Sequence, residues 1–201
     1  MMAGNDRYFS PPMRDQTYLR VRGFDAEGRR SGGIINPQLV ELRSGTVLVR
    51  LYHDRSKRFG EWWSTPHELR LVTEYFARSG PAFATGRTEG KGILHATLAV
   101  RHDWSGNSPL HLGQFFVVRL AESLRAYHGE GDHAPDASQR QVQKAVHITD
   151  SANRQRFARQ IFLPRPWEYE RAFVVMHEGT TDTGLPRALT MFDRGPLPFE
   201  T

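Results

Sequence analysis

Three short segments of the chain carry residue types suited to chemistry on an anionic substrate, and the first contains Arg50. This arginine stands in the run 46–52, whose other members are mostly β-branched or apolar. A charge in such a strand costs free energy unless it is paired or reaches the end of the strand. Arg50 therefore requires either a structural partner, such as a buried carboxylate, or an anionic ligand that its planar guanidinium holds with two hydrogen bonds.

The second segment, residues 62–65 with the sequence Trp-Trp-Ser-Thr, directly precedes a predicted helix. Thr65 and Glu68 have the spacing of a capping box, and Pro66 occupies the first helical position. Capping alone would account for Thr65. The N–H groups of a helix N-terminus beside Ser64 and two indole rings are also suited to bind an anion and an aromatic ring.

The third segment is Glu168-Tyr169-Glu170. If it lies in a strand, the two carboxylates project to the same side, because side chains alternate along a strand. Two like charges so close are unfavourable in a purely structural strand. They fit either a solvent-exposed edge or a pair of acidic groups that act together on a substrate.

Composition limits the chemistry further. The 201 residues contain 27 Lys and Arg against 22 Asp and Glu, which gives a formal charge of +5, and they contain no Cys. Thiolate metal sites, disulfides and cysteine nucleophiles are therefore excluded. The basic balance favours an acidic or nucleic-acid partner. Apolar runs are too short for a membrane span, and the start of the chain lacks a secretory signal. We expect a cytoplasmic protein, or one delivered without a cleavable signal, and no membrane partner.

Taken together, Arg50, the segment 62–65 and Glu168-Tyr169-Glu170 resemble the three motifs of the ADP-ribosyltransferase superfamily. In its arginine-serine-glutamate branch, an Arg on a first strand, an aromatic-Ser-Thr-Ser strand and a Glu-x-Glu or Gln-x-Glu element surround NAD. Here Pro66 replaces the last residue of Ser-Thr-Ser. The short gap between Arg50 and the tryptophans is similar to that of smaller bacterial and phage-related members, and the resemblance covers roughly residues 46–176.

The resemblance implies that the nicotinamide–ribose bond of NAD is broken and that ADP-ribose passes to a macromolecular acceptor, a protein or a nucleic acid. The transition state is oxocarbenium-like, as in glycoside hydrolysis. Glu170 would stabilise the positive charge on the ribose, Glu168 would orient or deprotonate the acceptor, and Arg50 would hold the pyrophosphate or ribose. The remaining residues that the resemblance assigns to NAD binding, with His53 and Tyr75 taken from the histidine-tyrosine-glutamate branch, are His53, Trp62, Trp63, Ser64, Thr65 and Tyr75. No metal is implied.

The expected architecture is a mixed α+β fold. The resemblance implies an ADP-ribosyltransferase-like split β-sheet core with flanking helices. Residues 1–33, rich in Gly and Pro, are expected to form a loosely structured N-terminal arm, and residues 34–201 a single catalytic domain with a polar loop near 129–141. Local patterns predict strands over 46–52, 92–101, 167–177 and 188–192. They predict helices over 36–43, from residue 66 to about 79, and from about 151 to 161.

Other functions fit the same residues. Within the superfold, water or phosphate could replace the macromolecular acceptor, which would make the protein an NAD glycohydrolase or phosphorylase. From a different class, a basic nucleic-acid-binding module could use Arg55, Lys57 and Arg58 with the two tryptophans as stacking platforms. A purely structural or interaction protein is the third interpretation.

Overall fold

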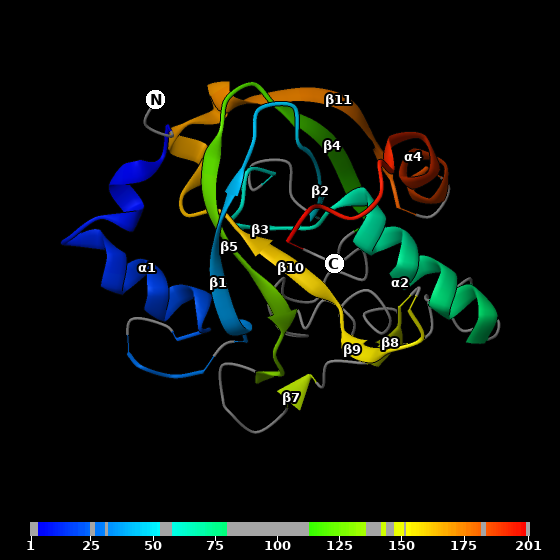
Figure 1. The fold of residues 1–201 in the computed structure, drawn as a ribbon, viewed down its shortest axis with the longest axis horizontal. Coiled ribbons are helices and arrows are strands. Elements are labelled where there is room, and N and C mark those ends of the chain that lie inside the picture. Colours follow the sequence, from blue (N-terminus) through cyan, green and yellow to red (C-terminus); the bar gives the residue numbers. More distant parts are fainter. Residues whose placement is uncertain are drawn as a thin grey trace.

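The computed structural model describes residues 4–24, 27–30, 32–52, 58–79, 113–135, 142–143, 147–150, 152–181 and 184–199. The fold is mixed α+β, as predicted, with helices on the outer faces of antiparallel sheets (Figure 1). In chain order, the elements are η1 (Asp6–Phe9), α1 (Met13–Val21), β1 (Ile34–Leu42), β2 (Val47–Tyr52), β3 (Trp62–Trp63), α2 (Pro66–Ser79), β4 (Gln114–Leu120), β5 (Leu124–Gly131), β6 (Ala134–Pro135), β7 (Val142–Gln143), β8 (His147–Thr149), β9 (Gln155–Phe157), β10 (Arg159–Phe162), η3 (Pro166–Glu168), η4 (Glu170–Ala172), β11 (Phe173–Thr180) and α4 (Leu185–Phe192).

Two antiparallel sheets form the framework. The first has the strand order β1-β5-β10-β3, and the second has the order β11-β4-β2. Their inner edges, β3 and β2, meet through a single antiparallel bridge in which Val49 and Ser64 exchange backbone hydrogen bonds of 2.8 and 2.9 Å. The segments with Arg50 and with the two tryptophans therefore lie side by side at the junction of the sheets.

Alternation along the strands divides the core into three clusters. One face of β4 contributes Phe116 and Val118 to a cluster that draws residues from both sheets. The other face contributes Phe115 and Val117 to a second cluster, which α2 and α4 cover. The third cluster lies under η1 and α1 on the first sheet, where Phe162 packs with residues of β1 and β5.

The strand over 46–52 and the helix that begins at residue 66 are both confirmed. β2 spans Val47–Tyr52, and α2 spans Pro66–Ser79. Thr65 caps the helix, because its Oγ1 accepts the backbone N–H of Glu68 at 3.1 Å. The Glu68 carboxylate does not complete the predicted capping box. It binds Arg156 and the backbone N–H of Arg159 instead.

The helix predicted over 36–43 is wrong, because that segment is strand β1. Pairing with β5 along β1 outweighs the local N-cap signal of Asn36 and Pro37. Asn36 has a positive φ of 47°, and the register shift between Ile35 and Gln38 accommodates the proline. Long-range pairing has overridden a local preference here.

Two further local predictions fail. The helix expected near 151–161 is β9 and β10, because the Asp150 carboxylate accepts the N–H groups of Ala152 and Arg154 and closes a turn. The strand expected over 188–192 is helix α4. The segment 114–127, ambiguous in the sequence, contains β4 and the start of β5. The strand predicted over 92–101 lies outside the described residues.

The N-terminal segment differs from the loosely structured arm expected for residues 1–33. η1 and α1 bury Tyr8, Phe9 and Val21 against the first sheet. The Asn5 side chain exchanges hydrogen bonds of 2.8 and 2.9 Å with the backbone of Arg125.

Among the described helices, none is long and apolar enough to cross a membrane.

Candidate functional site

Arg50 lies where β2 meets the chain that enters β3. Its Nη1 donates a 2.6 Å hydrogen bond to the carbonyl oxygen of Trp62, and its guanidinium lies 6.0 Å from the ring centroid of Trp63. Burial lowers the pKa of Arg50 to about 10, while the charge of Glu61 acts in the opposite direction. Arg50 therefore stays charged at neutral pH and binds the segment 60–62 to β2.

Gly60 is the residue that lets Arg50 reach this position. A Cβ atom built on Gly60 would lie 2.0 Å from Nη2 of Arg50 and 2.5 Å from its Cζ. Any side chain at this position would displace the guanidinium. A glycine two residues before the first tryptophan is thus part of the arrangement that holds the arginine.

Ser64 and Arg50 come from adjoining strands, but their side chains point to opposite faces. Paired residues of an antiparallel bridge share a face, so Ser64 lies on the side of Val49. Side chains alternate, so Arg50 and Trp63 occupy the other side. The arginine and serine that the resemblance groups together are therefore joined through backbone pairing and Trp62, not through direct contact of their side chains.

The strand beside β3 is β10, and it brings Gln160 to the site. Ile161 pairs with Trp63 and Phe162 with Trp62, and the pairing of β10 with β3 ends there, so Gln160 lies one residue before the partner of Trp63 and on the same face of the sheet as Ser64. Both side chains are buried. Gln160 Nε2 lies 2.7 Å from where a Cβ on Gly131 would stand, so this glycine permits its position.

The sequence does not single out Gln160, because the helix predicted over 151–161 would place it in the last helical turn. The signal that could have found it is the apolar run that follows it, residues 161–163, closed by Pro164. A short apolar run before a proline is typical of a buried strand as much as of a helix end.

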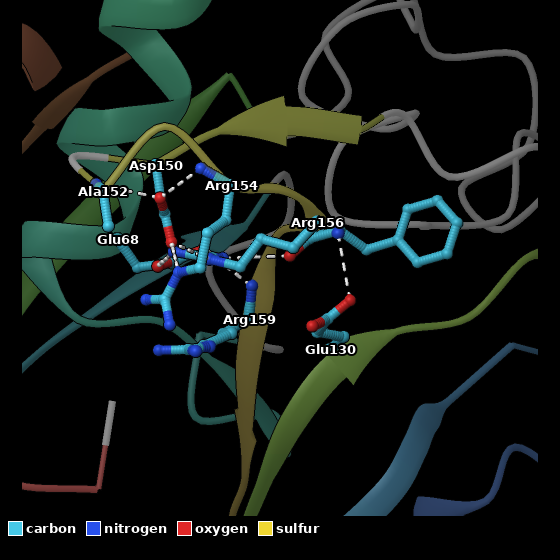
Figure 2. A network of polar contacts seen from close by, with 8 residues as sticks. Glu68, Glu130, Asp150, Ala152, Arg154, Arg156 and Arg159 are labelled. Carbon is cyan, nitrogen blue, oxygen red and sulfur yellow. Dashed lines mark hydrogen bonds and ion pairs between the residues drawn. The ribbon is translucent and has the colours of Figure 1, made fainter. Parts of the chain in front are cut away.

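Next to β10 lies a buried network of charged groups, which Figure 2 shows in close view. Arg156 donates from Nη1 and Nη2 to the two carboxylate oxygens of Glu68 at 2.6 and 2.7 Å. Glu68 Oε1 also accepts the backbone N–H of Arg159 at 2.7 Å, at the point where β3 has turned away into α2. Glu68 thus takes the place of a strand partner and ties the start of β10 to α2.

Asp150 completes this network from the β8–β9 turn. Its Oδ2 lies 2.9 Å from Nε of Arg154 and 3.5 Å from Nε of Arg156. Burial alone would raise the pKa of Asp150, but the hydrogen bonds from Arg154 and Ala152 lower it overall. Burial alone would likewise lower the pKa of Arg156, but Glu68 and Asp150 raise it. Both groups are held in their charged forms.

The structure corrects the placement of Glu168 and Glu170 on one side of a strand. Strand β11 begins only at Phe173, and the two glutamates belong to the successive 3-10 turns η3 and η4. The carboxylate of Glu168 binds Arg7, the hydroxyl of Tyr8 and Arg165. These bonds lower the pKa of the Glu168 carboxylate, and the hydrogen bond from the Tyr8 hydroxyl contributes most.

Glu170 differs from Glu168 in its surroundings. It is exposed, and in the described part of the structure no hydrogen bond or ion pair connects it to Ser64 or Arg50. The Pro164–Pro166 turn separates it along the chain from β10. The two glutamates are therefore not assembled into a paired-carboxylate site.

The two tryptophans have different environments. Trp63 is 2% exposed, stacks on Phe173 and contacts Phe116, so its ring faces cannot receive a base or nicotinamide. Trp62 is half-buried and meets Phe162 edge to face. Tyr75 is half-buried on α2 and packs against the cluster under α2 and α4. His53 lies outside the described residues.

In the described ranges, no three His, Asp or Glu residues are placed to hold one metal ion.

Comparison with known proteins gives little more. No family model matches the chain, and no curated protein matches it. A solved structure, Rhs1-CT in complex with its cognate immunity protein RhsI1, is similar in shape over 82% of this chain and 95% of that chain, with 12% sequence identity and a TM-score of 0.44. A likeness of this size indicates no function for the present chain.

Proposed function

We propose that the protein cleaves the nicotinamide–ribose bond of NAD, as an ADP-ribosyltransferase that passes ADP-ribose to a macromolecular acceptor. The observation that supports this most is the junction of β2 and β3. There the Val49–Ser64 bridge and the Arg50–Trp62 hydrogen bond bring together two of the three segments that resemble the superfamily. Their sequence separation alone did not require this contact.

The polar groups on one face of β3 and β10 have the character that this reaction needs. Breaking the bond develops positive charge on the ribose, so oxygen atoms fixed beside it lower the barrier. Ser64 offers a hydroxyl, Gln160 an amide oxygen, and half-buried Trp62 shares this face by alternation. These groups fit the nicotinamide half of NAD. Arg50 lies on the other face, so in this proposal it positions the 60–62 segment.

Hydrolysis of NAD is the second candidate, and the environment of Glu168 favours it. In the transferase interpretation this glutamate would orient the acceptor. In the structure its carboxylate is engaged by Arg7, Tyr8 and Arg165. With that group occupied, water is the acceptor that requires no further residue. A toxin-type role would follow from NAD consumption by either route.

The test is release of nicotinamide from NAD by the purified chain, alone and with cell lysate, DNA or RNA, using NAD labelled in its adenylate part. Labelled protein or nucleic acid would identify a transferase, and free ADP-ribose a hydrolase. Gln160→Ala should abolish release, while Glu170→Gln should leave it intact. Both variants must unfold at the wild-type temperature. Loss of activity in Glu170→Gln alone would show that Glu170, the glutamate that the resemblance names, is the catalytic group.

The proposal fails if the wild-type chain neither releases nicotinamide nor labels any acceptor, and if NAD leaves its melting temperature unchanged. A ligand that binds only the folded state raises that temperature, so the absence of a shift at millimolar NAD would exclude binding.

A further inference from the structure

The turn between β8 and β9 holds an exposed arginine in a fixed position. The Arg154 side chain is 58% exposed, and its Nε donates a 2.9 Å hydrogen bond to Oδ2 of Asp150, whose side chain is 4% exposed. Asp150 Oδ1 accepts the backbone N–H groups of Ala152 and Arg154 at 3.0 and 2.9 Å. The backbone N–H of Asp150 donates in return to the Arg154 carbonyl oxygen at 3.0 Å. The guanidinium is therefore tied through a buried carboxylate to a closed turn.

Hydrogen bonds use only one side of this guanidinium. Among the described residues, none accepts a bond from Nη1 or Nη2 of Arg154. Figure 2 shows these two atoms at the end of the side chain, pointing away from Asp150. A guanidinium whose Nη groups are open in this way can donate parallel hydrogen bonds to neighbouring oxygens of one phosphate.

A second arginine adds positive charge on the same side of β10. Arg159 begins this strand, and its backbone N–H is held at 2.7 Å by Oε1 of Glu68. Figure 2 shows the Arg159 side chain extending to the same side of β10 as Arg154, while Glu130 extends to the other side and accepts a backbone N–H of β9. The side chains of Asp150 and Glu68 are 4% and 2% exposed. Of these charged groups, the two that reach solvent on this side are therefore the arginines.

We propose that Arg154 and Arg159 form a binding site for a phosphate group, in which Nη1 and Nη2 of Arg154 donate to neighbouring phosphate oxygens. Ordering a flexible side chain opposes binding, but Asp150 has already ordered that of Arg154. Two positive charges favour a ligand with more than one negative charge, such as the diphosphate of a nucleotide.

This phosphate site is separate from the face proposed for the nicotinamide half of NAD. Side chains alternate along β10, so Arg159 and Gln160 point to opposite faces of the sheet. Binding of a phosphate at Arg154 therefore does not require that the protein cleaves NAD. The chemistry recognised is that of phosphate oxygens, which a free nucleotide and a nucleic-acid backbone both carry.

Isothermal titration of the full chain with inorganic pyrophosphate and with ADP tests the proposal. Wild type should bind both, and Arg154→Gln should raise each dissociation constant at least about tenfold, because charged hydrogen bonds are lost. Arg154→Lys should not restore the affinity, because an ammonium group lacks the planar fork. Arg159→Gln, which keeps the backbone contact with Glu68, should also weaken binding.

Arg14→Gln is the matched control. Arg14 is also 58% exposed and also pairs through Nε, at 3.3 Å, but its partner Asp15 is 84% exposed and cannot fix it in the same way. This change should leave both dissociation constants unaltered. Equal melting temperatures of the variants and the wild type would show that Arg154→Gln acts on binding and not on folding.

Three results overturn the proposal: a wild-type chain that binds neither ligand at about 10 mM, equal losses in Arg154→Gln and Arg14→Gln, or full recovery in Arg154→Lys. A third titration, with a single-stranded oligonucleotide, identifies the source of the phosphate. Tighter binding of ADP indicates a nucleotide, and tighter binding of the oligonucleotide indicates a backbone phosphate, provided that Arg154→Gln weakens it. Since pyrophosphate contains no nicotinamide, failure here and failure of NAD cleavage are separate results.

Discussion

The buried pair Glu68–Arg156 offers the sharpest test of how this fold is held together. The substitution Glu68→Gln keeps the size of the side chain and one oxygen acceptor but removes its charge. Arg156, which is 8% exposed, then keeps Asp150, with 3.5 Å between the nearest atoms, and the charge of Glu130 as acidic partners. Two hydrogen bonds from the guanidinium and one from the backbone of Arg159 lose a charged acceptor.

The expected cost follows from leaving a buried cation undercompensated. Removing one member of a buried ion pair costs about 3–5 kcal/mol. The retained amide oxygen and Asp150 place Glu68→Gln at the lower end, about 3 kcal/mol. For a chain of this length, each kcal/mol lowers the melting temperature by about 2–4 °C, so the expected shift is about 6–12 °C.

The matched control is Glu74, which lies about 1.7 turns further along the same helix. Glu74 pairs with Arg70 at 2.5 Å, and the two side chains are 40% and 32% exposed. Glu74→Gln should cost at most about 0.5 kcal/mol, because exposed pairs contribute little. Urea and thermal unfolding of both variants measure the difference.

Two further measurements test whether Glu68 compensates the buried charge of Arg156. Replacing Arg156 by Met in the Glu68→Gln background should recover stability, because no buried charge then lacks its partner. If Glu68→Gln costs no more than Glu74→Gln, the buried network does not hold β10 to α2.

Two further predictions concern contacts outside that network. Gly60→Ala should destabilise the fold by about 1–3 kcal/mol, because the new methyl group collides with the guanidinium of Arg50. In denaturant titrations the same change should cost less in an Arg50→Met background, and equal costs would show that the close approach is unimportant. Burial alone would raise the pKa of Asp193, but bonds from Arg70 and Gly195 lower it from its ordinary value of 3.8. Asp193 therefore stabilises the fold fully above its unfolded-state pKa, and this contribution is lost as pH falls through the lowered folded-state pKa. Asp193→Asn should flatten that part of the stability–pH curve, and an unchanged curve would refute the assignment.

Some features of this protein were determined by the sequence alone. The apolar run with β-branched residues became β2, and the Thr65–Pro66 signal began α2 at the expected residue. Both signals are local, since a cap and a proline act within one turn, and an apolar run requires burial wherever it lies. The need of Arg50 for a polar or anionic partner also followed from its own neighbours in the sequence, because they place a charge in an apolar strand.

The partner of Arg50 could not be predicted from neighbouring residues in the sequence. The backbone carbonyl of Trp62 and the space above Gly60 could be assigned to Arg50 only when β2 and β3 were seen to meet. The mixed α+β class followed from the pattern of elements, but the strand order β1-β5-β10-β3 and the conversion of two predicted helices into strands did not. A strand is completed by residues far away in the sequence, so its partners cannot be read from its own residues.

The candidate site shows the same division. The sequence supplied the residue types at 50 and 62–65, and the motif pattern pointed to the glutamates at 168 and 170. Tertiary structure decided which of these meet: it joined the first two segments, turned Glu168 toward Arg7 and Tyr8, and put Gln160 on the same face of the first sheet as Ser64. Residue types follow from the chain, but the residue that faces a given side chain is fixed by strand register, which is a property of the whole fold.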